Sequence, residues 1–320
     1  MMPPRFACAR WLPGAHLQTV YAALVARAPR VPLVRERWDT PDGDFVDVDI
    51  LEGPPGAPWV QLFHGLEGSS ASPYARMLME HTRRRGWRGS VVHFRGCGGE
   101  PNRLQRAYHS GDSEEADWIL RRLKERAGHA PLYAAGVSLG GNVLAKWLGE
   151  RGEAALAVVE RAAAISAPLD LMAGGEALGR GFGLLYTRHF LRTLKRNALG
   201  RLERFPGLLD GEAVRRARTL RDFDNAVTAP LHGFRDTDDY WTRASAKPWL
   251  SSIRVPTLLV NARDDPFLPE AALPTEREVS DAVKLEFPAR GGHVGFVSGP
   301  FPGNIEWLPT RILHFFEHRE

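Results

Sequence analysis

The chain has 320 residues, of which 43% are hydrophobic, and its 42 Lys and Arg residues slightly exceed its 38 Asp and Glu residues. This composition is typical of a cytoplasmic globular enzyme with a substantial core, and the length suits one α/β domain that carries an insertion. The two cysteines, Cys8 and Cys97, are too few for a disulfide framework and lack the spacing of metal ligands.

The N-terminal region predicts neither a signal peptide nor a membrane span. Proline, glycine and polar residues interrupt any apolar run there. No segment of the chain reaches the roughly 18 to 20 apolar residues that a membrane helix needs. Residues 15–26 instead predict an amphipathic surface helix, and we expect a cytoplasmic protein.

Strands and helices alternate along most of the chain. Residues 34–40 and 45–51 predict an antiparallel pair joined by a Pro-Asp-Gly-Asp turn. The pattern then predicts strands at 59–64, 89–94, 131–135 and 162–166 and near Leu258 and Leu285, and helices at 73–86, 112–127 and 141–149 and from about residue 308. Such alternation indicates an α/β fold, with a mostly parallel eight-stranded sheet and helices on both faces.

Residues 170–247 interrupt this alternation. The interval is too long for a plain connection, and helical stretches at 186–199 and 212–220 indicate a helical lid, inserted after the sixth strand of a single domain that spans 1–320. Between positions 180 and 221 the lid carries eleven Lys or Arg and three acidic residues. That excess of eight exceeds the net charge of +4 of the whole chain.

This basic cluster has three interpretations. It is a solvated helical face, or it attracts anionic substrates or an anionic membrane surface in peripheral contact. Nucleic-acid binding is suggested by the basic isoelectric point, but we do not expect it because none of the usual nucleic-acid modules is present. The oligomeric state stays open.

The segment Gly136-Val-Ser-Leu-Gly140 lies between an apolar strand and a helical stretch. Glycines on both sides of a serine allow the tight turn of a nucleophile elbow, which exposes the serine hydroxyl at the head of the strand. Ser138 is therefore the candidate nucleophile.

A serine hydroxyl needs a histidine to take its proton and an acid to orient that histidine. Asp264 and Asp265 follow the apolar run that begins at Thr257, and His293 lies in a later glycine-rich loop. The order serine, aspartate, histidine is the order of α/β-hydrolases. The spacing alone leaves the choice between the two aspartates open.

A further apolar strand ends in His64-Gly-Leu-Glu-Gly68. In acyl transfer the carbonyl oxygen becomes an anion that fixed backbone N–H groups stabilise. We expect one such donor from Leu139, the residue after the nucleophile, and a second from the loop after Gly65, at Leu66. We interpret His64 as a structural residue that orients this loop.

Taken together, the chain resembles the α/β-hydrolase family that includes the bacterial YheT proteins, the plant embryogenesis-associated proteins and the related animal abhydrolase-domain proteins. The matching stretches are His16–Thr19, Asp42–Asp49, His64–Gly68, Phe94–Asn102, Gly136–Asn142, Phe223–Phe234, Asn261–Pro266 and Gly291–Phe296. The resemblance implies esterase or acyltransferase activity on acyl esters, and animal members are associated with lipid substrates. It also favours Asp265 over Asp264, because the acid of this fold commonly stands directly before a proline.

The sequence thus predicts a serine hydrolase that cleaves carboxylic esters through Ser138, Asp265 and His293, without a cofactor. The histidines lack metal-binding spacing, so we expect no metal. Two alternatives remain open. One is an acyltransferase that makes esters from an acyl donor and an alcohol, and the other is a catalytically silent lipid-binding relative.

Overall fold

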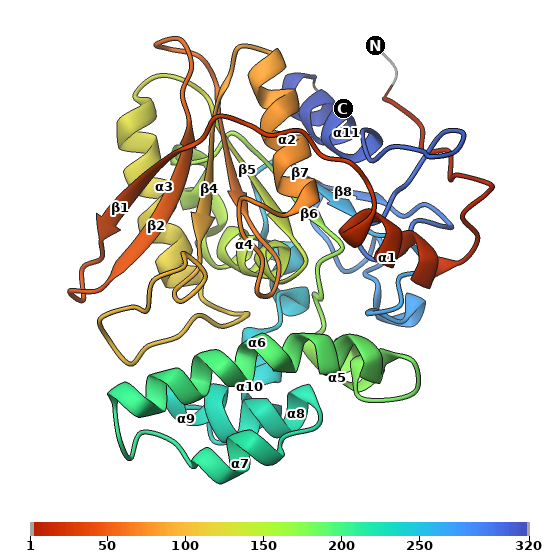
Figure 1. The fold of residues 1–320 in the computed structure, drawn as a ribbon. Coiled ribbons are helices and arrows are strands. Elements are labelled where there is room, and N and C mark those ends of the chain that lie inside the picture. Colours follow the sequence, from red (N-terminus) through yellow and green to blue (C-terminus); the bar gives the residue numbers. More distant parts are fainter. Residues whose placement is uncertain (1–2, 319–320) are drawn as a thin grey trace.

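The computed structural model describes residues 3–318. Its centre is one eight-stranded sheet with the strand order β1-β2-β4-β3-β5-β6-β7-β8 (Figure 1). The strands are β1 (Val34–Asp39), β2 (Phe45–Leu51), β3 (Trp59–Phe63), β4 (Arg88–His93), β5 (Leu132–Val137), β6 (Arg161–Ile165), β7 (Thr257–Val260) and β8 (Val283–Glu286). Only β2 pairs antiparallel with its two neighbours, β1 and β4, and all other pairs are parallel. The predicted mostly parallel eight-stranded sheet is confirmed.

Helices cover both faces of this sheet, because alternate side chains of the central strands point to opposite sides. On one face, Val60 and Leu62 of β3 share a buried apolar cluster with α2 (Pro73–Arg84) and α11 (Trp307–Glu317). On the other face, Trp59 and Phe63 share a cluster with α3 (Ser113–Ala127) and α4 (Leu139–Arg151). The sheet is therefore buried from both sides, as its parallel pairing requires.

The segment between β6 and β7 is helical and lies as a separate layer across one end of the sheet (Figure 1). Its helices are α5 (Leu171–Leu178), α6 (Gly183–Arg204), α7 (Gly211–Arg216), α8 (Leu220–Phe223), α9 (Ala229–His232) and α10 (Thr237–Ala244), with a π-helical turn at Asp224–Thr228. A small apolar cluster of its own, which includes Leu191, Val214 and Phe223, joins α6 to α7 and α8. We call residues 170–247 the insertion.

One predicted helix of the insertion is wrong in extent. The stretch 212–220 is not continuous, because α7 ends at Arg216 and Ala217 has extended backbone angles. Thr219 then caps a new helix, since its hydroxyl accepts the N–H of Asp222 while the Asp222 carboxylate accepts the N–H of Thr219. The sequence pattern missed this capping box because the apolar residues on either side continue a helical period.

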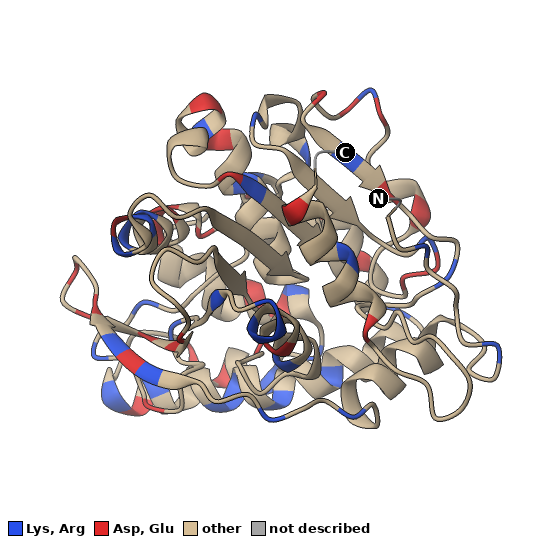
Figure 2. Ribbon diagram, turned by 90° about the horizontal axis from the view of Figure 1, so that it is seen from above, with Lys and Arg blue, Asp and Glu red and all other residues tan. Residues whose placement is uncertain are grey.

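The basic cluster of the insertion is partly neutralised at the surface. Glu212 lies 3.1 Å from Arg215 and 3.9 Å from Arg216, and Arg221 pairs with Asp238. Elsewhere, Lys and Arg are interspersed with Asp and Glu over the surface helices (Figure 2). Exposed pairs of this kind contribute about 0–1 kcal/mol each to stability.

Arg95, in the loop after β4, ties three separate segments together. Its side chain is 3% exposed and contacts Asp42 at 2.8 Å, Asp44 at 3.2 Å and Glu115 at 2.6 Å. The two aspartates belong to the turn between β1 and β2, and Glu115 belongs to α3. Loss of the guanidinium would leave buried carboxylates without a counter-charge.

We predict that Arg95→Leu lowers the free energy of unfolding by about 3–5 kcal/mol, because breaking a buried ion pair strands its partner charges. Arg121→Leu, which breaks a half-exposed pair with Asp117 one turn away on α3, should cost at most about 1 kcal/mol. Urea denaturation followed by circular dichroism measures both. An equal loss of unfolding free energy in the two variants would contradict the structural role of the buried Arg95 ion pairs.

Candidate active site

Ser138 stands at the carboxyl end of β5, directly before α4. Its backbone angles are φ 52° and ψ −123°, a conformation that non-glycine residues seldom adopt and that is typical of strained functional turns. The Ser138 N–H donates to the carbonyl of Ile165 in the neighbouring strand at 2.8 Å. This bond holds the turn against the sheet and leaves the hydroxyl free to face the end of the strand.

Both flanking glycines are required by close backbone contacts. A Cβ on Gly136 would lie 2.3 Å from the carbonyl oxygen of Gly140, and a Cβ on Gly140 would lie 2.3 Å from the carbonyl oxygen of Phe63. No side chain can be accommodated at such distances, and both obstacles are backbone atoms. The Gly-x-Ser-x-Gly pattern therefore lets α4 begin directly against the end of β3.

The structure brings the three predicted residues into one hydrogen-bonded row. His293 Nε2 lies 2.9 Å from Ser138 Oγ, and His293 Nδ1 lies 2.9 Å from Asp265 Oδ2 and 3.2 Å from Asp265 Oδ1. Asp265 follows β7 and His293 follows β8, so all three residues come from the carboxyl ends of parallel strands. The Asp265 carboxylate also accepts the backbone N–H of Phe267 at 2.8 Å, which fixes its orientation.

The neighbouring aspartate contacts a different group. Asp264 Oδ1 accepts the backbone N–H of Gly292 at 2.9 Å, so it holds the loop that carries the histidine. The geometry thus separates Asp265, which contacts the imidazole, from Asp264, which contacts only the backbone beside it.

The loop of His293 is anchored by residues that the sequence reasoning did not assign to the site. Thr19 Oγ1 accepts the N–H of His293 at 2.8 Å, and Gln18 Oε1 accepts the N–H of Val297 at 2.9 Å. Both belong to α1 (Ala15–Leu24), where they are buried. The sequence predicts an amphipathic surface helix here, and that pattern does not show that these two polar residues face inward.

An aromatic ring fixes the imidazole from a second side. The ring of Phe267 stacks on that of His293, with 3.9 Å between centroids and 18° between planes. The imidazole is thus held by hydrogen bonds at both nitrogens and by packing against its face. Little rotational freedom remains for it.

His64 organises the loop next to the nucleophile. The Nδ1 of His64 lies 2.7 Å from the carbonyl oxygen of Gly65, and Nε2 accepts the N–H of Phe94 at 3.2 Å. These contacts place the single proton on Nδ1, and burial lowers the pKa of His64 to about 3, so it remains neutral. A Cβ on Gly65 would lie 3.2 Å from the Cβ of Ser138, which shows that the loop passes directly beside the nucleophile.

The two expected oxyanion donors lie on the wall of the cavity that contains Ser138. Leu139 is the first residue of α4, so its N–H has no acceptor within the helix. Within the described part of the chain, the N–H of Leu66 likewise makes no hydrogen bond. Two backbone donors without an acceptor among the described residues therefore belong to residues that line the cavity of Ser138.

The cavity above Ser138 has a volume of about 150 Å³ and lies between the ends of the strands and the insertion. Its walls are mostly apolar, with α5, α6 and α10 contributing Leu171, Leu178, Phe190, Leu194 and Trp241. Polar groups also reach it, among them Glu67, His109, Asn197, Arg201, Asp224 and His232.

The segment Phe223–Phe234, which the sequence identified only through resemblance, forms part of this wall. The lining residues from it include Phe223, Asp224, Val227 and His232. Asp224 lies at the start of the π-helical turn and accepts hydrogen bonds from Thr228 at 2.6 Å and from Trp241 at 2.9 Å. Burial raises the pKa of Asp224 to about 6.

Two histidines are among the polar residues of the same wall. The rings of His109 and His232 are 4.5 Å apart. Burial lowers the pKa of each to about 3, so both are neutral at physiological pH. They offer hydrogen-bonding nitrogens to the cavity without adding charge.

Comparison with known proteins agrees with this architecture. A family model described as alpha/beta hydrolase fold matches residues 58–300. The solved structure of Est1E from Butyrivibrio proteoclasticus with bound ferulic acid superimposes with a TM-score of 0.57 at 16% identity, covering 88% of this chain and 98% of that one. At that identity the likeness shows the fold alone.

Two relatives are similar over almost the whole chain. YheT of Escherichia coli K12 is 42% identical over 308 residues, which cover 95% of this chain and 90% of that protein. The phospholipase ABHD3 of Mus musculus is 30% identical over 317 residues, covering 96% of this chain and 77% of that protein. The chain therefore belongs to the α/β-hydrolase family, among the relatives of YheT and ABHD3.

Proposed function

We propose that this protein is a serine hydrolase that cleaves carboxylic esters. The observation that carries the proposal is the hydrogen-bonded row from Ser138 through His293 to Asp265, which ends in a largely apolar cavity. Such a row activates a serine for acyl transfer. Catalysis by the pair of Ser138 and His293 needs no cofactor.

In the proposed reaction, Ser138 Oγ attacks the acyl carbon while His293 Nε2 takes its proton. Asp265 stabilises the imidazolium that forms. The carbonyl oxygen becomes an anion, which the N–H groups of Leu66 and Leu139 bind. As the tetrahedral intermediate collapses, His293 gives its proton to the departing alcohol and an acyl-enzyme remains. Water activated by His293 then releases the acid and restores Ser138.

The cavity supports acyl esters with an apolar chain as the substrate class. Leucine and aromatic side chains of the insertion line it beside the nucleophile, and apolar walls of this kind bind hydrocarbon by excluding water from it. The mouse relative is named a phospholipase, which favours lipid esters. An alcohol that replaces water at the acyl-enzyme would make the same site an acyltransferase, and product analysis with and without added alcohol separates the two outcomes.

We further propose that the insertion acts as a lid. It supplies most of the apolar side chains of the cavity, and it lies across the end of the sheet at which Ser138, Asp265 and His293 meet. A cover of this kind excludes water from the reacting groups and strengthens the electrostatic interactions among them.

Peripheral contact with a membrane is supported by the outer surface of α1. Leu17, Val20 and Leu24 follow one face of this helix and are 52%, 38% and 76% exposed. The polar side chains Gln18 and Thr19 face inward instead. An apolar face turned to water, at helical spacing, is typical of a surface that meets lipid.

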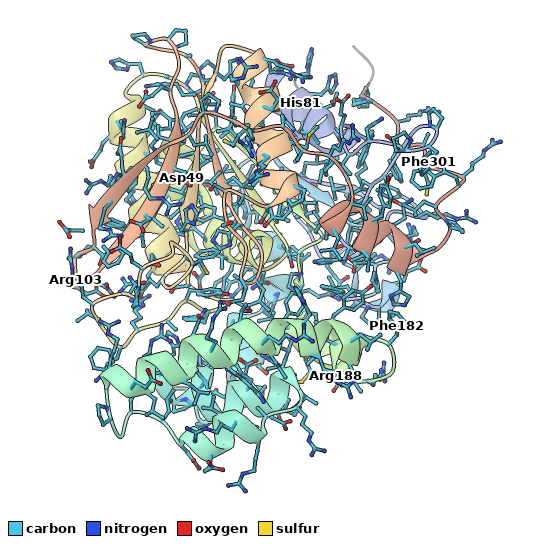
Figure 3. All side chains as sticks on the ribbon, in the orientation of Figure 1. Asp49, His81, Arg103, Phe182, Arg188 and Phe301 are labelled. Carbon is cyan, nitrogen blue, oxygen red and sulfur yellow. The ribbon has the colours of Figure 1, made fainter. Side chains whose placement is uncertain are left out.

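The start of α6 extends this apolar face. His16 of α1 stacks on Phe182 with 4.1 Å between centroids, and Phe182 and Leu185 are 53% and 50% exposed. Figure 3 shows Phe182 and Arg188 on the insertion, at the end that lies below α1. Exposed Arg188 and Arg192 follow on α6, so basic charge borders the apolar face and complements an anionic lipid surface.

The first test of the proposed function is covalent labelling. A fluorophosphonate should label Ser138, because only an activated serine attacks such a phosphorus centre at a useful rate. Ser138→Ala should abolish labelling and lower kcat for a p-nitrophenyl ester by about 10⁴- to 10⁶-fold, with an unchanged circular dichroism spectrum. Labelling that persists in the folded variant would rule out Ser138 as the nucleophile.

The second test separates the two aspartates. Asp265→Asn should lower kcat by about 10⁴-fold, because the histidine then takes the wrong tautomer. Asp264→Asn should retain most activity, since an amide oxygen can still accept the Gly292 N–H. Steady-state kinetics on the same ester measures both variants, and the opposite ranking would transfer the role of the acid to Asp264.

The third test concerns the membrane-facing surface. The double variant Leu17→Gln, Leu24→Gln should bind vesicles containing phosphatidylglycerol about tenfold more weakly, because it removes the side chains that would enter the lipid. Leu156→Gln is the matched control, because Leu156 is 49% exposed in the segment before β6, at the opposite end of the strands from the site. Vesicle co-sedimentation gives the affinities, and equal binding by all three proteins would refute the contact.

A further inference from the structure

One wall of the cavity is a single face of α6 that changes from apolar to charged along its length. Phe190, Leu194, Asn197 and Arg201 all line the cavity and recur every three to four residues. At the apolar end, Phe190 packs on Phe267, the residue that stacks on His293. Arg201 stands eleven positions after Phe190, which corresponds to a rise of about 16 Å along the helix.

The charged end lies beside the loops that follow β3 and β4. Asn197 Nδ2 donates to Glu67 Oε2 at 3.0 Å. Arg201 Nη2 lies 3.8 Å from the position that a Cβ of Gly96 would occupy. Arg201 therefore lies on the same continuous wall as Phe190, at its charged end.

The guanidinium of Arg201 lacks an ion-pair partner among the described residues. No carboxylate within residues 3–318 comes within the 4.0 Å of an ion pair, and its guanidinium donates no hydrogen bond to the described part of the protein. Arg95, which lines the same cavity, contacts three carboxylates. On the same helix, Arg204 donates to the carbonyl of Asn102 at 2.5 Å. Arg201 is thus a half-buried cation whose donors face the cavity unused.

The two nearest acidic residues are already engaged with other donors. Glu67 Oε1 accepts the Tyr108 hydroxyl at 2.8 Å, and its other oxygen accepts Asn197. Asp44 pairs with Arg95 and also accepts the side-chain amide of Asn102 at 3.0 Å. Neither carboxylate is free to turn toward the guanidinium.

We propose that Arg201 binds an anionic group of the substrate, a carboxylate or a phosphate, at the charged end of the α6 wall. This inference rests on the proposed esterase function and names its substrate class as anionic acyl esters. Arginine suits this role because its planar fork of donors matches carboxylate and phosphate oxygens. The apolar stretch of α6 between Phe190 and Arg201 accommodates the hydrocarbon that joins the ester to the charge.

The anion can belong to either side of the ester bond, and two matched substrate pairs distinguish these sources. The acyl-side pair is p-nitrophenyl hexanoate and the p-nitrophenyl monoester of adipic acid, which differ in a terminal carboxylate. The alcohol-side pair is 1-hexanoylglycerol and 1-hexanoylglycerol 3-phosphate. Wild-type protein should prefer the anionic member of at least one pair.

Arg201→Gln should lower kcat/KM for the preferred anionic ester by about 10- to 100-fold, the range expected for a lost hydrogen bond to a charged group. The neutral member of the pair should change less than about twofold. Arg201→Lys should recover part of the loss, because the charge is retained without the fork. Arg196→Gln is the control, since Arg196 lies on α6, is exposed and is not part of the cavity wall.

Binding to the Ser138→Ala protein separates failure of this inference from failure of the esterase function. In calorimetry, the Ser138→Ala protein should bind 1-hexanoylglycerol 3-phosphate or adipate monoethyl ester more tightly than the double variant Ser138→Ala, Arg201→Gln does. Equal binding of both anionic probes by these two proteins would overturn the role of Arg201, whatever the esterase assays give. Equal losses on neutral and anionic esters in Arg201→Gln would overturn it as well.

Discussion

The close approach of α4 to the end of β3 is the constraint on which the site depends. The backbone of Gly140 contacts the carbonyls of Phe63 and His64 so closely that no Cβ could be present. This contact sets the position of Ser138 on its strained turn, and it also sets the loop after His64 beside the serine. The nucleophile and the predicted oxyanion donors are therefore positioned by one backbone contact rather than by two independent loops.

The remaining parts of the site come from distant parts of the chain and converge on the same edge of the sheet. Asp265 and His293 follow β7 and β8, while α1, near the N-terminus, holds the histidine loop through Gln18 and Thr19. A parallel sheet brings its carboxyl ends together, which is why loops separated by more than a hundred residues meet there. The outer face of α1 is apolar, so the helix that steadies the histidine is also the one we propose to meet lipid.

Charge inside the cavity is distributed unevenly. Arg95 is surrounded by carboxylates and has a structural role, whereas Arg201 faces the cavity and has no ion-pair partner in the described part of the chain. His64, His109 and His232 are held neutral by burial. The arrangement leaves Arg201 as a cation of the cavity wall without an ion-pair partner among residues 3–318, and such a charge is costly until an anion binds it.

The sequence by itself determined the sheet, the order of its elements, and Ser138 and His293 together with a pair of candidate aspartates, because glycine spacing and strand alternation are local signals that survive without tertiary contacts. It could not separate Asp264 from Asp265 without resemblance to known proteins, since both stand in one loop and only the folded chain shows which carboxylate reaches the imidazole. It also missed the role of Gln18 and Thr19 and the isolation of Arg201. The hydrogen-bond and ion-pair partners of a side chain are set by packing between segments far apart in sequence, and only the tertiary structure decides them.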